Sequence, residues 1–155
     1  MNPIIQVNNL TKQYKEITAV DGINFQVEKG ELFGFLGING AGKSTTINML
    51  CTVFKPTAGE IEICGLTVGK DDEEIRRRIG VVYQNNCLDE RLTIKENLFI
   101  RGSLYETNTQ RLKEKVHHVC DILGLEDIYT RRFHKLSGGQ KRRCEIARNE
   151  NERRI

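Results

Sequence analysis

A glycine-rich stretch of this chain reads Gly37-Ile38-Asn39-Gly40-Ala41-Gly42-Lys43-Ser44-Thr45. It fits the pattern G-x-x-x-x-G-K-[ST], in which glycines let the backbone curl so that successive N–H groups point at phosphate oxygens. Lys43 is placed to reach the β- and γ-phosphates of a nucleotide, and the Ser44 hydroxyl to join a Mg²⁺ shell. The stretch therefore predicts a nucleotide-binding loop, without saying what the nucleotide drives.

The segments on either side of this loop give it a structural context. Glu31–Leu36 is nearly all apolar, which predicts a strand buried on both faces that runs directly into the loop. Residues 43–54 predict a helix that ends before Pro56, because Ile47, Leu50 and Phe54 recur at helical spacing. A strand, a glycine loop and a helix in this order are the setting expected for a phosphate site.

The rest of the chain predicts a few more strands and a long helical part. Alternation and apolar runs predict strands at 4–7, 23–27, 59–64 and 79–83, and a charged helix at 71–78. Thr93 and Glu96 form a capping box, which predicts a helix from about Ile94 to about Tyr105. An apolar stripe before Gly124 predicts a further helix and comprises Leu112, Val116, Val119, Cys120 and Leu123. We expect one domain over 1–155, with about 85–135 a mainly helical insertion.

A second glycine motif reads Leu136-Ser137-Gly138-Gly139-Gln140. Ser137 suits the cap of a helix, and Gln140 three residues later completes another capping box. Two glycines after the cap leave backbone N–H groups unshielded, so an anion can approach them closely. The alternative is that the motif only starts a helix.

In this order, the two motifs resemble the ATP-binding cassette (ABC) family, the ATPases of ABC transporters. The resemblance covers Ile4 to about Arg148 and implies an α/β fold of the P-loop NTPase type, with N-terminal antiparallel strands and a helical insertion. It also implies ATP and Mg²⁺ as cofactors. Two such domains would pair head to tail, with ATP held between the glycine loop of one and the Ser137 motif of the other.

The resemblance assigns roles to two residues outside these motifs. Tyr14 matches the aromatic residue that stacks on adenine; the alternative is a tyrosine that packs at the edge of the sheet. Gln84 matches the glutamine that touches Mg²⁺ and the γ-phosphate; the alternative is a polar residue that merely ends a strand. The predicted nucleotide-binding residues are Tyr14, Gly37, Ile38, Asn39, Gly40, Ala41, Gly42, Lys43, Ser44, Thr45, Gln84, Ser137, Gly138, Gly139 and Gln140, with Ser44 and Gln84 also at the metal.

The end of the chain departs from the family. The polar residues 149–155 follow Arg148, and no apolar strand ending in Asp-Glu comes after the second motif. The resemblance therefore implies a chain truncated before the strand that bears the metal-binding and catalytic carboxylates. We nominate no catalytic residue, expect Glu150 and Glu152 to lie in a tail that does not fix them, and expect the chain by itself not to hydrolyse ATP.

Composition limits the classes of function that fit. The 155 residues carry a net charge of +3, which is too small to argue for nucleic acid binding. No run of 18 or more apolar residues and no N-terminal signal pattern is present, so we expect a cytoplasmic protein that reaches the membrane only through a permease partner. The five cysteines lack the spacing of a metal site and are expected to be small buried or neutral residues, and the three histidines lack ligand-like companions.

Three functions are compatible with these features of the sequence. The first is the ATP-binding part of an ABC transporter subunit that couples ATP binding and hydrolysis to export by a separate permease. Residues 84–93, 95–98 and 141–143 look most like drug exporters of the daunorubicin-resistance type. The others are a non-catalytic remnant and a soluble ABC-type ATPase that acts on ribosomes or DNA.

Overall fold

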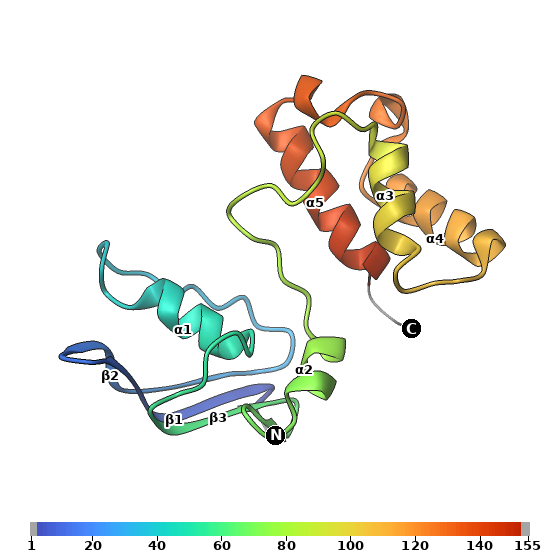
Figure 1. Ribbon diagram of the computed structural model, residues 1–155. Coiled ribbons are helices and arrows are strands. Elements are labelled where there is room, and N and C mark those ends of the chain that lie inside the picture. The colour runs from blue at the N-terminus through green and yellow to red at the C-terminus, as the bar shows by residue number, and fades with distance from the viewer. Residues whose placement is uncertain (1–2, 153–155) are drawn as a thin grey trace. The chain divides into compact units, whose positions relative to one another are not determined.

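The computed structural model of the chain describes residues 3–152 (Figure 1). They form two compact units, one that ends at Ile79 and one that begins at Gly80. The first unit holds the sheet, and the second is built of helices.

The first unit contains a four-stranded antiparallel sheet in the order β2-β1-β3-β4. The strands are β1 (Ile5–Tyr14), β2 (Ile17–Val27), β3 (Ala58–Ile63) and β4 (Leu66–Thr67). β1 pairs with β2 on one side and with β3 on the other. The antiparallel strands predicted at the N-terminus and at 59–64 are confirmed, and the first two are longer than predicted.

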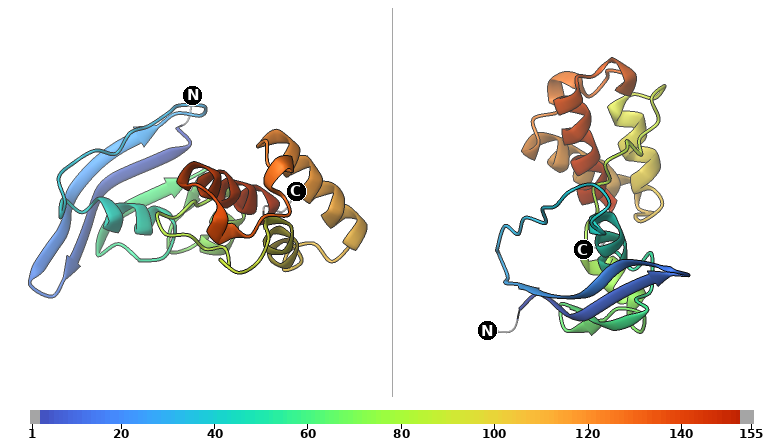
Figure 2. Two further views of the ribbon diagram at one scale, coloured as in Figure 1. Left: turned by 90° about the horizontal axis from the view of Figure 1, so that it is seen from above. Right: turned by 90° about the vertical axis from the view of Figure 1, so that its left-hand side faces the viewer.

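Two helices complete this unit. Helix α1 (Lys43–Leu50) lies over one face of the sheet (Figure 2), where Met49 joins the buried cluster of the strands. It ends four residues earlier than predicted, because Thr52 adopts a left-handed backbone with φ of 59°. Helix α2 (Asp72–Arg78) is acidic in its first turn and basic in its last, as the helix dipole favours. Its single apolar residue, Ile75, is fully buried.

The strand predicted at Glu31–Leu36 is wrong. These residues have no regular structure, and Leu32 and Leu36 are 99% and 93% exposed. A strand exists only where a neighbouring strand pairs with its backbone groups. In the part of the chain that the structure describes, the strands of the sheet pair only with one another, so an apolar composition alone does not make this segment a strand.

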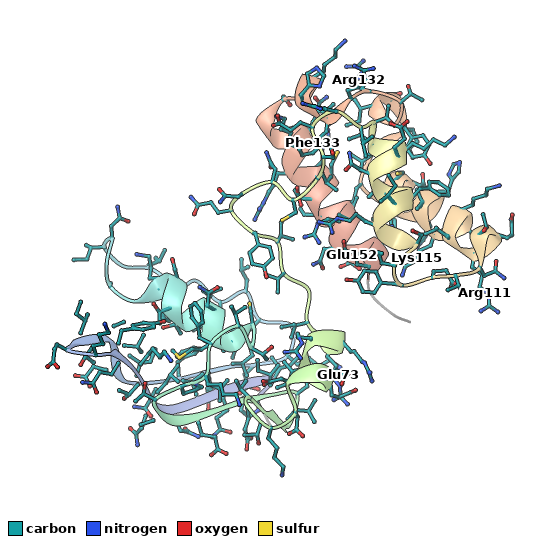
Figure 3. The ribbon with its side chains drawn as sticks, viewed as in Figure 1. Glu73, Arg111, Lys115, Arg132, Phe133 and Glu152 are labelled. Carbon is teal, nitrogen blue, oxygen red and sulfur yellow. The ribbon has the colours of Figure 1, made fainter. Side chains whose placement is uncertain are left out.

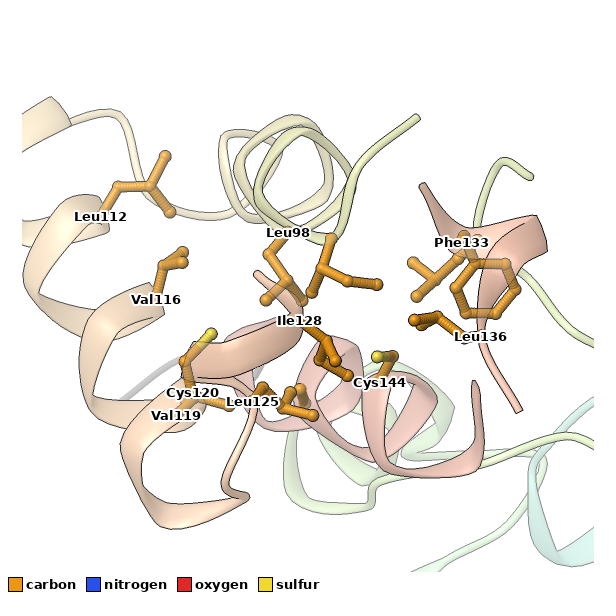
Figure 4. Packing of buried hydrophobic residues seen from close by; sticks show 13 residues of the cluster. Leu98, Leu112, Val116, Val119, Cys120, Leu125, Ile128, Phe133, Leu136 and Cys144 are labelled. Atoms are coloured by element: carbon orange, nitrogen blue, oxygen red, sulfur yellow. The ribbon is translucent and has the colours of Figure 1, made fainter. Parts of the chain in front are cut away.

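The second unit packs three α-helices and two short 3₁₀ turns around one apolar cluster (Figure 4). The elements are α3 (Ile94–Gly102), α4 (Thr109–Ile122), η1 (Glu126–Ile128), η2 (Phe133–Lys135) and α5 (Gly138–Glu152). The capping box at the start of α3 is confirmed in both directions, with Glu96 N–H donating to the Thr93 hydroxyl and Thr93 N–H donating to the Glu96 carboxylate. These hydrogen bonds from Thr93 lower the pKa of Glu96.

The apolar stripe predicted before Gly124 is confirmed as the inner face of α4. Leu112, Val116, Val119 and Cys120 are buried there, and Leu123 packs against the same cluster. Helix α3 ends at Gly102, earlier than the predicted Tyr105. The strand predicted at 79–83 is wrong for the same reason as the one at 31–36: no neighbour within residues 3–152 pairs with it.

Helix α5 corrects the prediction of an unfixed polar tail after Arg148. The helix continues to Glu152 (Figure 3). The Glu152 carboxylate lies 2.7 Å from Arg148 and 3.9 Å from Arg101. Its inward face is formed by Cys144, Ala147, Arg148 and Asn151, which recur at helical spacing with polar residues in buried positions. The predicted tail beyond Glu152 lies outside the described residues.

The buried thiols give a testable property of this core. All five cysteines are free, and Cys120 and Cys144 are buried, whereas the other three are partly exposed. Burial raises the pKa of Cys120 to about 11 and that of Cys144 to about 12. Since the thiolate is the nucleophile, we expect both to resist iodoacetamide at pH 8 in the folded protein and to react once urea unfolds it. Peptide mass spectrometry that finds equal labelling in both states would contradict the packing of this core.

No helix formed by residues 3–152 combines the length and the apolar composition needed to span a bilayer.

Candidate functional site

The glycine loop leads into helix α1 without a capping side chain. Gly42 is the N-cap residue and has a left-handed backbone, with φ of 78°. Ala41 N–H donates to the Ile38 carbonyl, which closes a turn just before the helix. The first N–H groups of a helix have no partner within it, and here no side chain of the cap covers them. The start of α1 is therefore suited to bind an anion.

Lys43 places its positive charge over this loop. Its ammonium group donates hydrogen bonds to the carbonyl oxygens of Gly37 and Ile38, both at 2.6 Å. The side chain folds back over the residues that precede it instead of extending from the helix. Ser44 follows in the first turn of α1, and its side chain is exposed. The loop thus combines helix N–H groups, a cation and an exposed hydroxyl, a donor set that fits a polyphosphate with a bound Mg²⁺.

Two glycines of the loop adopt backbone angles that other residues rarely take, for different reasons. A methyl group placed on Gly42 would overlap with the backbone carbonyl oxygen of Ala19 in β2. The same group on Gly40, which has φ of 87°, would meet open space. Gly42 therefore fixes the loop against the sheet, whereas Gly40 only supplies a turn.

Tyr14 ends strand β1 in the same unit and is 42% exposed. The edge of its ring meets Phe54, with the ring centroids 6.4 Å apart at an interplanar angle of 86°. The Lys12 ammonium lies 5.2 Å from the centroid of the Tyr14 ring. These contacts hold the ring in place and leave part of it accessible for stacking.

The second motif starts helix α5 as predicted. Gln140 N–H donates to the Ser137 hydroxyl at 3.3 Å, and Ser137 N–H donates to the Gln140 side-chain oxygen at 3.0 Å. This reciprocal pair is the predicted capping box. A methyl group placed on Gly138 or Gly139 would meet open space beyond the helix's own backbone and the adjacent residues. The turn is therefore open as well as capped.

Gln84 lies in an exposed segment without regular structure, not at the end of a strand. The carbonyl of the preceding Tyr83 accepts a hydrogen bond from Arg142 of α5 at 2.6 Å. The structure thus connects the segment that carries Gln84 to the helix that the second motif starts. Tyr14 and the glycine loop belong to the first unit, and Gln84 and the second motif to the other.

Sequence reasoning missed a buried carboxylate in α5. Glu145 is 1% exposed and accepts hydrogen bonds from the backbone N–H groups of Cys87 and Leu88, at 2.6 and 3.0 Å. Its second oxygen pairs with Arg148 at 3.1 Å. Burial lowers the pKa of Arg148, but Glu152 and Glu145 raise it by more, so the net shift is upward. The sequence did hold a sign of this carboxylate. Charged and polar residues occupy positions of the helix that share a face with Cys144 and Ala147, where apolar residues are expected.

Within the described part of the chain, no group of three or more His, Cys, Asp or Glu side chains could hold a metal ion. A Mg²⁺ ion at the glycine loop would instead depend on the Ser44 hydroxyl and on the phosphates that it accompanies.

Comparison with known proteins gives consistent matches. A model of the ABC transporter family matches residues 20–153. Nod factor export ATP-binding protein I of Ralstonia nicotianae is 39% identical over 147 residues, which are 95% of this chain and 46% of that protein. The daunorubicin/doxorubicin resistance ATP-binding protein DrrA of Streptomyces peucetius is 41% identical over 143 residues, which are 92% and 43% of the two chains. The chain thus spans about half the length of the curated relatives that it matches.

Solved structures agree with these relatives. CbiO1 from Clostridium perfringens, part of an ABC transporter complex, has a TM-score of 0.88 at 26% identity, over 98% of this chain and 62% of that one. The ATP-binding cassette MJ0796, solved as a dimer bound to ADP and Pi, has a TM-score of 0.78 at 30% identity, over 96% and 69% of the two chains.

Proposed function

The chain belongs to the ABC transporter family, and on that premise we propose that it binds ATP with Mg²⁺ as part of the ATP-binding subunit of an exporter. The single observation that carries the proposal is the start of α1. There, a helix begins at a glycine without a capping side chain, and the Lys43 ammonium lies over the loop that leads into it. An anion at this position gains the helix N–H groups and a cation together.

Each predicted residue has a role in this proposal. The backbone from Gly37 to Thr45 surrounds the phosphates, and Lys43 moves its hydrogen bonds from loop carbonyls to phosphate oxygens. Ser44 and Gln84 would hold the metal when it is bound with the nucleotide, and Tyr14 would stack on the base. Bound ATP would supply the energy of its phosphate bond to the transporter. Base stacking is worth about 1–3 kcal/mol and accepts any base, so triphosphate recognition dominates.

A titration of the chain with Mg-ATP, Mg-GTP and Mg-tripolyphosphate tests this division of roles. We expect all three to bind, with the two nucleotides tighter than tripolyphosphate by about 5- to 150-fold, as one stacked base implies. No binding of any of them to folded protein would overturn the proposed function. Equal affinity for tripolyphosphate and ATP would remove Tyr14 from the site.

We also propose that the Ser137 motif serves a second copy of the domain. Its open, capped turn suits a phosphate that another subunit presents, in the head-to-tail pairing that the family resemblance implies. The MJ0796 cassette, to which this chain is similar, was solved as a dimer. The composite site would make ATP part of the contact between the two domains.

Ser137→Ala separates the two halves of such a site. We expect nearly unchanged ATP affinity of the single chain and weaker ATP-dependent pairing with a full-length cassette of the family, measured by analytical ultracentrifugation. Loss of the cap costs about 1 kcal/mol of helix stability, so circular dichroism must first establish folding. Ser103→Ala, at the end of α3, is the matched control. A fall in ATP affinity as large as that from a Lys43 substitution would contradict action on a partner's nucleotide.

The proposed exporter function also implies a membrane partner and a location in the cell. We propose that the protein is cytoplasmic and lies against the membrane through a separate permease, in a transporter of the drug-exporting type. The relatives are named for export and for drug resistance, which supports this function over one on ribosomes or DNA. The net charge of +3 gives nucleic acid no strong attraction.

A further inference from the structure

The short segment between β2 and the glycine loop is built like a strand that lacks a partner. Phe33 and Phe35 both pack against Phe25 of β2, with ring centroids 5.3 and 5.6 Å away. Leu32 and Leu36 alternate with them along the chain and are 99% and 93% exposed. The rings of Phe33 and Phe35 lie 6.4 Å apart, close to the ~6.6 Å that two residues of a strand span. The segment is therefore extended, with one face on the sheet and an apolar face in solvent.

The backbone of this segment is free to pair with another strand. Within residues 3–152, no hydrogen bond involves a backbone N–H or C=O group of residues 32–36. Gly34, at the centre, does not have a left-handed backbone, and a methyl group placed on it would meet open space. Unpaired backbone groups on an extended segment are a template for a further strand, and a glycine lets a second backbone approach closely.

The sequence of the segment reads the same in both directions: Leu32-Phe33-Gly34-Phe35-Leu36. When two such segments pair antiparallel about Gly34, each leucine lies opposite a leucine of the other copy, and each phenylalanine opposite a phenylalanine. Matched apolar side chains then share a face, and such cross-strand pairs stabilise a sheet. A contact in which each residue meets its counterpart in both directions is what a twofold axis between identical chains requires.

Charges at the ends of such a pair are complementary. In the same register, Glu31 lies opposite Gly37 of the second copy. The Gly37 carbonyl accepts a hydrogen bond from the Lys43 ammonium at 2.6 Å, so a carboxylate and an ammonium meet at each end. The two Glu31 residues lie about 20 Å apart, at opposite ends of the pair, so like charges do not face each other.

We propose that residues 32–36 bind the same residues of a second copy of this chain, as an antiparallel strand pair centred on Gly34. The contact needs no nucleotide and differs from the head-to-tail pairing proposed above, so it goes beyond the proposed function. Two strands this short bury less than the roughly 1,200–2,000 Å² of a stable complex. We therefore expect the pair to form at about 100 μM protein and to dissociate at about 1 μM, as contacts of small area do.

Cysteines introduced one at a time into the whole chain test the register, without nucleotide and with oxidised glutathione as the oxidant. Opposite residues of an antiparallel pair have Cα atoms about 4.5–5.5 Å apart, which suits a disulfide. Gly34→Cys should therefore link to itself. Leu32→Cys should not, because the two copies of this position lie about 13 Å apart. It should instead link to Leu36→Cys when the two variants are mixed.

Mass spectrometry of the linked peptides identifies each disulfide. It separates the expected links from any that involve the five native thiols, for which the oxidised unaltered protein gives the background.

Leu32→Asn tests the affinity, and Ile17→Asn is its matched control. Ile17, at the start of β2, is another apolar residue of the first unit and is 69% exposed. In sedimentation equilibrium, Leu32→Asn should weaken self-association by about 10-fold or more, because the pair buries less apolar surface. Ile17→Asn should leave self-association unchanged. Both side chains are exposed, so neither variant removes a contact of the core.

Three results would overturn the inference. The first is Leu32→Cys linking to itself as readily as Gly34→Cys, which indicates a parallel pair or random collision. The second is a chain that stays monomeric at about 100 μM, where contacts of small area should form. The third is an equal loss of self-association in Leu32→Asn and Ile17→Asn. None of these results bears on ATP binding by the glycine loop, so the proposed function is tested separately.

Discussion

Replacing Lys43 with alanine is expected to weaken the binding of Mg-ATP to this chain by about 100-fold or more. In the structure the Lys43 ammonium makes two short hydrogen bonds to the loop, and both would pass to phosphate oxygens when a nucleotide binds. Hydrogen bonds between charged groups contribute about 1.5–3 kcal/mol each, so two of them correspond to about 100- to 10,000-fold in affinity. Alanine cannot supply either bond.

Isothermal titration calorimetry of the two proteins measures this effect. Lys29→Ala is a suitable control, because Lys29 is an exposed lysine in the same unit that lies in the turn after β2. It changes the net charge by the same amount, so a general electrostatic effect would weaken binding equally in both variants. Equal ATP affinity for Lys43→Ala and the unaltered protein would show that the glycine loop is not the nucleotide site.

The parts of the fold that the sequence predicted well are those decided by neighbouring residues. Both capping boxes formed as expected, since Thr93 and Glu96, like Ser137 and Gln140, lie only three positions apart in the sequence. The apolar face of α4 was equally predictable, because helical spacing alone determines which side chains share a face. The glycine loop was placed before a helix for the same local reason.

The errors concern interactions between distant residues. Apolar composition at 31–36 and 79–83 predicted strands, but a strand also needs a partner, and composition does not say whether one is present. Glu145 was overlooked because its role depends on Cys87 and Leu88, 58 and 57 residues away. A charged residue in a helix is usually assigned to the side that faces solvent. Only the structure shows that Glu145 is buried in α5, where its carboxylate accepts hydrogen bonds from backbone N–H groups.

Gly42→Ala is expected to cost more stability than any other single change in the loop, and Gly40→Ala is its matched control. Both glycines have a positive φ, so an alanine at either position incurs about 1–2 kcal/mol of backbone strain. Only at Gly42 would the added methyl group also overlap with the Ala19 carbonyl oxygen, and forcing such a group into a packed place costs about 1–3 kcal/mol more. We therefore expect a loss of about 2–5 kcal/mol for Gly42→Ala and about 1–2 kcal/mol for Gly40→Ala.

Urea unfolding followed by circular dichroism measures both losses, and hydrogen exchange locates them. For Gly42→Ala, exchange should increase in α1 and around Ala19, because the start of the helix must move away from β2 to make room. The displaced N–H groups and Lys43 would then no longer converge, so ATP affinity should fall even in protein that remains folded. Gly40→Ala should keep its exchange pattern in β2, since nothing lies beside the new methyl group. If the two variants lost the same stability, the contact of Gly42 with Ala19 would not be what fixes the loop to the sheet, and backbone strain alone would account for both glycines.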